Sequence, residues 1–165
     1  YEEALPIVQS WFKEPVIPKN IAKRKESTRS DSVDIFSKTD PVDEMYRKVT
    51  SSYYNFEHDS LIKNGQKFIE LYPDNPLITN CRYLMGEIYY RKGNLEEAEK
   101  LLELVLKVES PMEPYALYKM AQVYNNTDRP YLSQVNLNRI ITKFPDSDVM
   151  PKTIEFMKEI GGNNE

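Results

Sequence analysis

A short phrase that ends one helix and begins the next occurs twice in the chain, in phase with itself. Tyr72-Pro73-Asp74-Asn75 and Phe144-Pro145-Asp146-Ser147 start 72 residues apart, or two periods of 36, and a weaker boundary, Glu109-Ser110-Pro111, lies between them. Proline ends the first helix at such a boundary. One polar residue at each boundary is expected to cap the next helix by accepting backbone N–H bonds, namely Asn75, Ser110 and Ser147. An internal period of this length predicts an array of stacked units.

A second phrase repeats in the same phase. Tyr46-Arg-Lys-Val49, Tyr83-Leu-Met-Gly86 and Tyr118-Lys-Met-Ala121 each place a small or branched residue three positions after a tyrosine, and these last residues are spaced by 37 and 35. The small residue is expected to let the neighbouring helix approach, while the aromatic ring fills the space beside it.

The central unit shows what is repeated. An apolar stripe at helical spacing (Leu77, Cys81, Leu84, Met85, Ile88) ends at Lys92-Gly93, which is a helix C-cap signal. Asn94 is expected to cap a second helix, with Glu97 completing a capping box, and that helix carries its own apolar stripe (Leu95, Ala98, Leu101, Leu102, Val105, Leu106). A single such pair leaves apolar faces uncovered, so neighbouring pairs must stack.

Gly86-x-x-Tyr89-x-x-x-Gly93-x-x-x-x-Ala98 resembles the signature of the tetratricopeptide-repeat family, and Pro73 and Pro145 stand where that family ends its repeats. The resemblance implies an all-α fold, a right-handed superhelical solenoid of antiparallel helix pairs. Three repeats are expected within residues 41–147, at about 42–75, 79–112 and 114–147, followed by a capping helix and tail at 148–165. Four residues depart from the family pattern: Ser52, Leu61, Gly65 and Ser133.

The boundary phrase and the long period most resemble bacterial cell-envelope members of this family, of the outer-membrane assembly lipoprotein and Tol-Pal accessory type. That resemblance implies a scaffold or assembly role in the periplasm or envelope. The chain starts at Tyr1 and not at Met, so a signal peptide or a lipid anchor would lie upstream. No run of apolar residues approaches the roughly 20 needed to cross a bilayer.

The first forty residues differ in character from the rest. Residues 1–14 align with the helix that begins at Leu95, so they are expected to form either the second helix of a truncated upstream repeat or an unrelated amphipathic helix, which Pro6 would kink. Residues 15–40 have no helical period and are interpreted as a polar, basic linker. Five basic residues and one acid lie between positions 19 and 29. This run fits a solvated tether, with phosphate or membrane-surface binding as the alternative.

In this family the first helix of each repeat lines the concave face, and the resemblance therefore implies a partner-binding groove rich in tyrosine. The residues carried over to it are Tyr46, Thr50, Tyr53, Tyr54, Tyr83, Glu87, Tyr90, Tyr115, Tyr118 and Gln122. Tyrosine suits peptide recognition because it offers a flat apolar ring and a hydroxyl at little entropic cost. The alternative is that each ring only packs between adjacent helices. The family's clamp for acidic chaperone tails needs Lys and Asn where Tyr46 and Thr50 stand, so no such binding is expected.

The composition argues against an enzymatic function. The chain has one His, one Cys and five Gly, with no Gly-rich phosphate loop, so we expect no enzymatic activity, no cofactor and no metal site. A net charge of -4 and a pI of about 5.2 disfavour nucleic-acid binding. The sequence thus predicts a module that binds another protein. The alternative is a structural subunit whose repeats pack permanently on the chain's own amino-terminal segment or on a fixed partner. The oligomeric state stays open.

Overall fold

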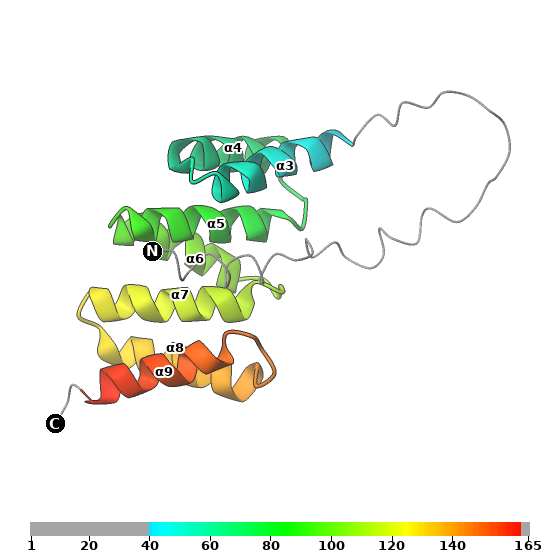
Figure 1. Ribbon diagram of the computed structural model, residues 1–165. Helices are drawn as coiled ribbons and strands as arrows, with labels where there is room; N and C mark the ends of the chain where they lie inside the picture. The colour runs from blue at the N-terminus through cyan, green and yellow to red at the C-terminus, as the bar shows by residue number, and fades with distance from the viewer. Residues whose placement is uncertain (1–39, 163–165) are drawn as a thin grey trace, which may run out of the picture. The chain divides into compact units, whose positions relative to one another are not determined.

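Residues 40–162, the part of the chain that the computed structural model describes, form seven helices and no strand (Figure 1). The helices are α3 (Pro41–Tyr54), α4 (His58–Leu71), α5 (Ile78–Arg91), α6 (Leu95–Leu106), α7 (Glu113–Asn126), α8 (Pro130–Lys143) and α9 (Met150–Gly162). The all-α solenoid of helix pairs is confirmed. The predicted amphipathic helix at 1–14 and nearly all of the predicted linker at 15–40 lie outside the described residues.

Each pair is built in the same way, and consecutive pairs interlock. Within a repeat the first helix packs on the second, as α3 does on α4, α5 on α6 and α7 on α8, and each second helix also packs on the next first helix. The helix α9 follows α8 in the same manner and closes the stack (Figure 1). Every internal helix therefore buries apolar surface on two sides, which a lone pair cannot do.

Two glycines mark the closest approaches between helices. A Cβ added at Gly86 of α5 would lie 3.2 Å from Cγ of Leu102 on α6, which confirms that the small residue after the tyrosine lets the neighbouring helix approach. A Cβ at Gly65 of α4 would lie 2.6 Å from Sδ of Met85 on α5. The departure from the family pattern at Gly65 thus makes room for a bulky methionine of the next repeat.

The turns inside the three repeats share one backbone geometry. Phe56, Gly93 and Asp128 have φ of 59°, 79° and 60°, and each is followed by a residue whose N–H donates to the carbonyl five positions earlier, at 2.8–2.9 Å. This is the Schellman arrangement, and it confirms the C-cap predicted at Lys92-Gly93. Only one of the three positions is a glycine. Phe56 adopts a left-handed conformation that is unfavourable for it, whereas aspartate, as at Asp128, tolerates this conformation better than most residues.

The helix starts differ from the sequence prediction. Asp40 caps α3 by accepting from the N–H of Val42 at 2.9 Å, but Asn94 makes no side-chain cap bond, so the predicted capping box with Glu97 is wrong. The ψ of Asn94 is 71° whereas that of Asp40 is 129°, and a side-chain cap needs the extended backbone that Asp40 has.

The polar residues expected to cap α5, α7 and α9 lie two residues before the cap positions. Instead the carbonyls of Asn75, Ser110 and Ser147 accept from the N–H groups three residues on, which begin the helices, at 3.0–3.1 Å. The side chains of Asn75 and Ser147 accept from the N–H two residues on, at 2.9 and 3.4 Å. The hydroxyl of Ser110 is buried without a hydrogen-bond partner among the described residues.

The outward face of α3 is polar where the other first helices are apolar. Cys81, Met85 and Ile88 of α5 are buried, as are the matching Ala116, Met120 and Val123 of α7. The matching positions of α3 are Glu44, Lys48 and Ser51, all exposed, and Lys48 pairs with Glu44 at 2.9 Å. An upstream second helix packed on α3 would have to bury this ion pair, at a cost in desolvation. Within residues 40–162, α3 is therefore the first helix whose outward face is polar.

Replacing Gly93 by alanine should lower the free energy of unfolding by about 1 kcal/mol, because alanine is strained at a φ of 79° although no atom lies within 4 Å of the added Cβ. The matched control is Gly161→Ala in α9, which also meets nothing within 4 Å but has no positive φ, so stability should be unchanged or slightly higher. Urea unfolding of both variants measures the difference, and equal effects would contradict the account of the turn.

A reciprocal exchange tests the departure at Ser133, which is fully buried on α8 with its hydroxyl lacking a hydrogen-bond partner among the described residues. Ser133→Ala should raise the free energy of unfolding by about 1 kcal/mol because the desolvated hydroxyl is removed. Ala98→Ser places the same hydroxyl at the matching position of α6 and should lower stability by a similar amount. Thermal and urea unfolding decide, and a loss of stability in Ser133→Ala would overturn this explanation.

Candidate functional site

The first helices adjoin along one side of the stack. Figure 1 shows α5 in front of α6 and α9 in front of α8, with α3 and α7 on the same side. Side chains cross from each first helix to the next at intervals of 33 to 38 residues. We call this side, where α3, α5, α7 and α9 contact one another through side chains, the first-helix face.

Tyrosines of α3 reach polar residues of α5. The hydroxyl of Tyr46 accepts from Nδ2 of Asn80 at 3.0 Å, and that of Tyr53 donates to Oε2 of Glu87 at 3.0 Å. The guanidinium of Arg91 donates to Oε1 of the same Glu87 at 2.6 Å and to the Tyr53 hydroxyl at 3.3 Å. The buried carboxylate of Glu87 is thus neutralised by Arg91 and hydrogen-bonded by a phenol from the previous repeat.

The same register continues toward the carboxyl end. Asn126 of α7 donates to the hydroxyl of Tyr90 on α5 at 2.9 Å, and the hydroxyl of Tyr115 donates to Asp148 at 2.7 Å. Two further contacts join aromatic rings of consecutive first helices edge to face. Tyr83 and Tyr115 lie 6.2 Å apart between centroids, and Tyr118 and Phe156 lie 6.1 Å apart. Tyrosine therefore fastens consecutive first helices to one another.

Burial controls the protonation of these phenols. Desolvation raises the pKa of Tyr46 to about 12 from an ordinary 10.0, and it raises the pKa of Tyr53, Tyr83 and Tyr115 as well. The neighbouring carboxylates of Glu87 and Asp148 add to the rise for Tyr53 and Tyr115, because a phenolate would be repelled. The phenols stay neutral hydrogen-bonding groups throughout the physiological range.

The structure places the ten predicted groove residues at different depths. Three of them are buried (Tyr53, Tyr83 and Glu87), six are half-buried (Tyr46, Thr50, Tyr90, Tyr115, Tyr118 and Gln122), and one is exposed (Tyr54). Thr50 donates to carbonyls of its own helix, and Oε1 of Gln122 is buried without a hydrogen-bond partner among the described residues. For Tyr53 and Tyr83 the observed role is packing between repeats, the alternative that the sequence left open. Binding of a partner stays a prediction.

Lys119 of α7 belongs to this face although the sequence analysis did not include it. Its Nζ lies 4.8 Å from the ring centroid of Tyr90, and it makes no hydrogen bond or ion pair to any described residue. Burial lowers its pKa, Glu87 opposes that effect, and the positive charges of Arg91 and Lys152 add to it. A helical-period argument could have found this lysine, since it follows Tyr115 by four residues and precedes Gln122 by three.

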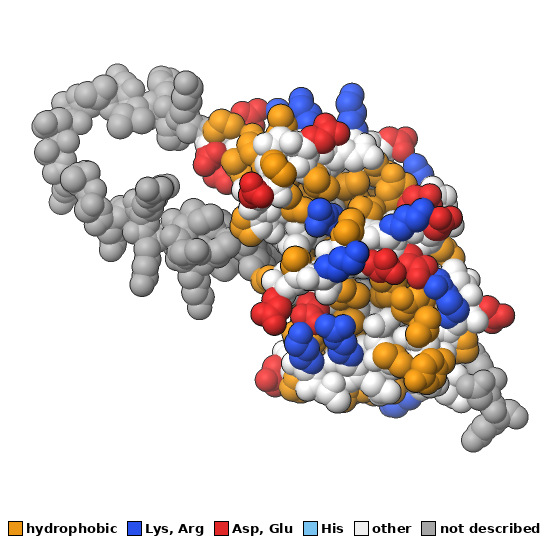
Figure 2. Space-filling view, turned by 180° about the vertical axis from the view of Figure 1, so that it is seen from behind, with side chains coloured by type: hydrophobic (Ala, Val, Ile, Leu, Met, Phe, Trp, Pro, Cys, Tyr) orange, Lys and Arg blue, Asp and Glu red, His pale blue; other side chains and the backbone are white. Residues whose placement is uncertain are grey.

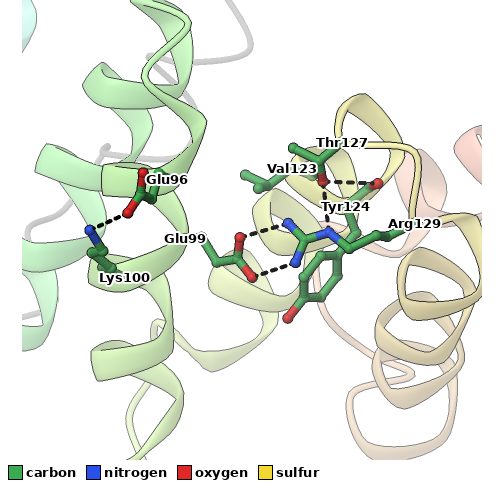
Figure 3. Close-up of polar contacts among 7 residues, drawn as sticks. All are labelled: Glu96, Glu99, Lys100, Val123, Tyr124, Thr127 and Arg129. Carbon is green, nitrogen blue, oxygen red and sulfur yellow. Dashed lines mark hydrogen bonds and ion pairs between the residues drawn. The ribbon is translucent and has the colours of Figure 1, made fainter.

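A second set of contacts joins the turn between the two helices of a repeat to the second helix of the previous repeat. Arg129 donates from both terminal nitrogens to Glu99 of α6, at 2.8 and 2.6 Å, and its guanidinium lies 4.5 Å from the ring centroid of Tyr124 (Figure 3). One repeat earlier, Lys92 pairs with Asp59 of α4 at 2.8 Å. The Arg129–Glu99 pair is partly buried and links the second and third repeats, whereas the exposed Lys92–Asp59 pair contributes little to stability.

Residues 40–162 contain no group of three or more His, Cys, Asp and Glu side chains arranged to hold a metal ion. The chain's Cys81 is buried in α5, where it packs as a small apolar residue, and His58 is the half-buried first residue of α4. None of the helices in this part of the chain is long and apolar enough to cross a membrane.

Alkaline unfolding tests the buried phenols. A phenol whose pKa is raised on folding stabilises the protein fully below the unfolded value of 10.0, and that stability is lost as the pH rises through the folded value, about 12 for Tyr46. We therefore expect the free energy of unfolding to fall between pH 10 and 12. Tyr46→Phe should cost about 1 kcal/mol at pH 7, from the lost bond to Asn80, and should show a shallower fall above pH 10. Parallel pH profiles for the two proteins would contradict this assignment.

Comparison with known proteins agrees with the repeat geometry. Residues 81–108 and 115–147 match the family model of the tetratricopeptide repeat. The first range covers most of α5 and all of α6, and the second covers most of α7 and all of α8, so each is one helix pair of the stack. The matched ranges leave out α3 and α4, where the departures Ser52, Leu61 and Gly65 lie. No curated protein matches the chain.

Proposed function

Because α5–α8 are tetratricopeptide repeats, which generally mediate contacts between proteins, we propose that this chain binds a segment of a partner polypeptide on its first-helix face. In this proposal it acts as a scaffold or assembly factor and catalyses no reaction. The first-helix face supports the binding role because it presents phenol rings, amides and charged groups along four consecutive helices, which can contact an extended or helical segment over its whole length.

The observation that carries the proposal is the environment of Lys119. Lys119 is half-buried with its ammonium group against the ring of Tyr90, it makes no hydrogen bond or ion pair to a described residue, and burial lowers its pKa more than the nearby Glu87 raises it. Removing a cation from water without a directly paired counter-ion is costly. An acidic or carbonyl-rich partner segment lying across α5 and α7 would compensate this charge, so Lys119 is expected to contact the partner directly.

The aromatic contribution to binding comes from tyrosines that are not fully used in the core. Tyr90 and Tyr118 are half-buried and lie on α5 and α7, next to Lys119 in space or in sequence. Tyr83 is only 4% exposed and Tyr53 7%, so these two rings support the face from below. Recognition residues on a rigid, packed layer lose little entropy on binding.

We place this role in the bacterial cell envelope on the boundary phrases Tyr72–Asn75 and Phe144–Ser147 and on the slightly long period. Fractionation of the native source, with the chain detected by antibody in periplasmic and membrane fractions, tests it.

The double variant Tyr90→Ala/Tyr118→Ala should weaken partner binding by about 2–4 kcal/mol, because both rings are expected to lie against the bound segment. The partner is first recovered from the native source with the full chain as bait, and the affinities are then measured by calorimetry. Thermal unfolding of the double variant should stay cooperative, which shows that the loss comes from the face and not from the fold.

The matched control is Leu71→Ala, which removes an exposed apolar side chain from α4, a second helix. It should bind the partner as the unaltered chain does. Undiminished binding by the double variant, or an equal loss in the control, would refute a site on the first-helix face.

A further inference from the structure

The second helices α4, α6 and α8 present one outward face to solvent, and its character changes in the third repeat. In α4 this face carries Asp59, Lys63 and Gln66, and in α6 the matching residues are Glu96, Lys100 and Glu103, all exposed. In α8 the same positions hold Tyr131, Val135 and Asn138, with Leu132 beside them. Tyr131 is 74% exposed and Val135 44%. Figure 2, which looks at the molecule from this side, shows hydrophobic side chains gathered at the α8 end.

The fold does not require this apolar surface. Lys100 pairs with Glu96 at 2.7 Å across one turn of α6 (Figure 3), which shows that a charged pair is accommodated at the positions of Tyr131 and Val135. Exposed apolar side chains gain nothing from the chain's own core and lower solubility. Their presence at matching positions of α8 alone indicates a contact outside this repeat stack.

The charges at the two ends of α8 are complementary to each other. Asp128 precedes the helix, is exposed, and makes no side-chain hydrogen bond or ion pair to a described residue. Near the other end, Arg139 and Lys143 share the single carboxylate of Glu113, at 2.5 and 2.8 Å, which leaves an excess of positive charge. Between these ends the outward face of α8 is uncharged. A surface with a negative charge at one end and a positive charge at the other is complementary to a second copy of itself in antiparallel orientation.

From this complementarity we propose that the outward face of α8 (Tyr131, Leu132 and Val135, flanked by Asp128 and Lys143) is the contact surface for a second copy of this chain. Two α8 helices pair antiparallel about a two-fold axis that passes beside Val135. Asp128 of each copy then lies opposite Lys143 of the other, and the helix dipoles oppose each other favourably. The patch is short, so the association is weak, with a Kd on the order of 100 µM.

This inference does not rest on the proposed function. The α8 surface belongs to a second helix, so the association leaves the first-helix faces of both copies open. A dimer would present two such faces and would bind a partner with two matching segments more tightly than one copy does.

Cysteine cross-linking in the full chain tests the axis. Val135→Cys should form an intermolecular disulfide under mild oxidation, because two cysteines beside a two-fold axis come within bonding distance. Lys100→Cys is the matched control, since it occupies the same position on α6. The native Cys81 is buried and does not compete. The initial rate for Val135→Cys should exceed that of the control roughly tenfold, the gain that a raised local concentration provides. Equal rates would overturn the proposal.

Sedimentation velocity gives an independent reading. The unaltered chain should show concentration-dependent dimer formation up to about 1 mM, as expected for a weak interface. The variant Tyr131→Glu/Val135→Lys, which copies onto α8 the residues that α6 carries, should stay monomeric with unchanged thermal unfolding. An unaltered chain that is monomeric throughout, or a variant that still dimerises, would refute the α8 contact and assign the exposed patch to another occupant.

Discussion

The need to bury two apolar faces of every helix pair is the constraint on which this structure depends. Within a pair, α5 and α6 approach so closely that a methyl group on Gly86 would press on Leu102. Between pairs, Gly65 of α4 admits Met85 of α5. Because each second helix is used on both sides, the pairs cannot separate without exposing apolar surface. Within residues 40–162, the first helix α3 has a polar outward face with the Glu44–Lys48 pair, and α9 packs on α8 as the last helix.

Tyrosine serves two purposes in this chain, and burial separates them. Tyr53 and Tyr83 are buried in contacts between first helices, where Tyr53 holds Glu87 and Tyr83 meets Tyr115 edge to face. Tyr90 and Tyr118 keep part of their surface beside Lys119. The buried tyrosines fix the spacing of the first helices, and in the proposed function the half-buried ones contact a partner. A rigid supporting layer of this kind lowers the entropic cost of recognition.

The periodic features of the fold were predictable because they follow from local chemistry. Proline boundaries, the Gly93 turn and the apolar stripes of α5 and α6 each depend on residues a few positions apart, and the structure contains all of them. The turn at Phe56 was not predictable, since phenylalanine does not favour a positive φ and the turn is imposed by the packing of the helices it joins. The side-chain cap at Asn94 failed because its backbone, with a ψ of 71°, is not extended, which the sequence alone does not reveal.

For the candidate site, the sequence predicted which helices line it but not which of their tyrosines are buried. The family resemblance indicated the first helices, but which tyrosines are buried depends on neighbours about 35 residues away, and no local pattern reports that.

Nuclear magnetic resonance of the full chain with its partner segment tests the central claim most directly. The account predicts that shift changes concentrate in α5 and α7, around Tyr90, Tyr118 and Lys119. Changes confined to α4, α6 and α8 would contradict it.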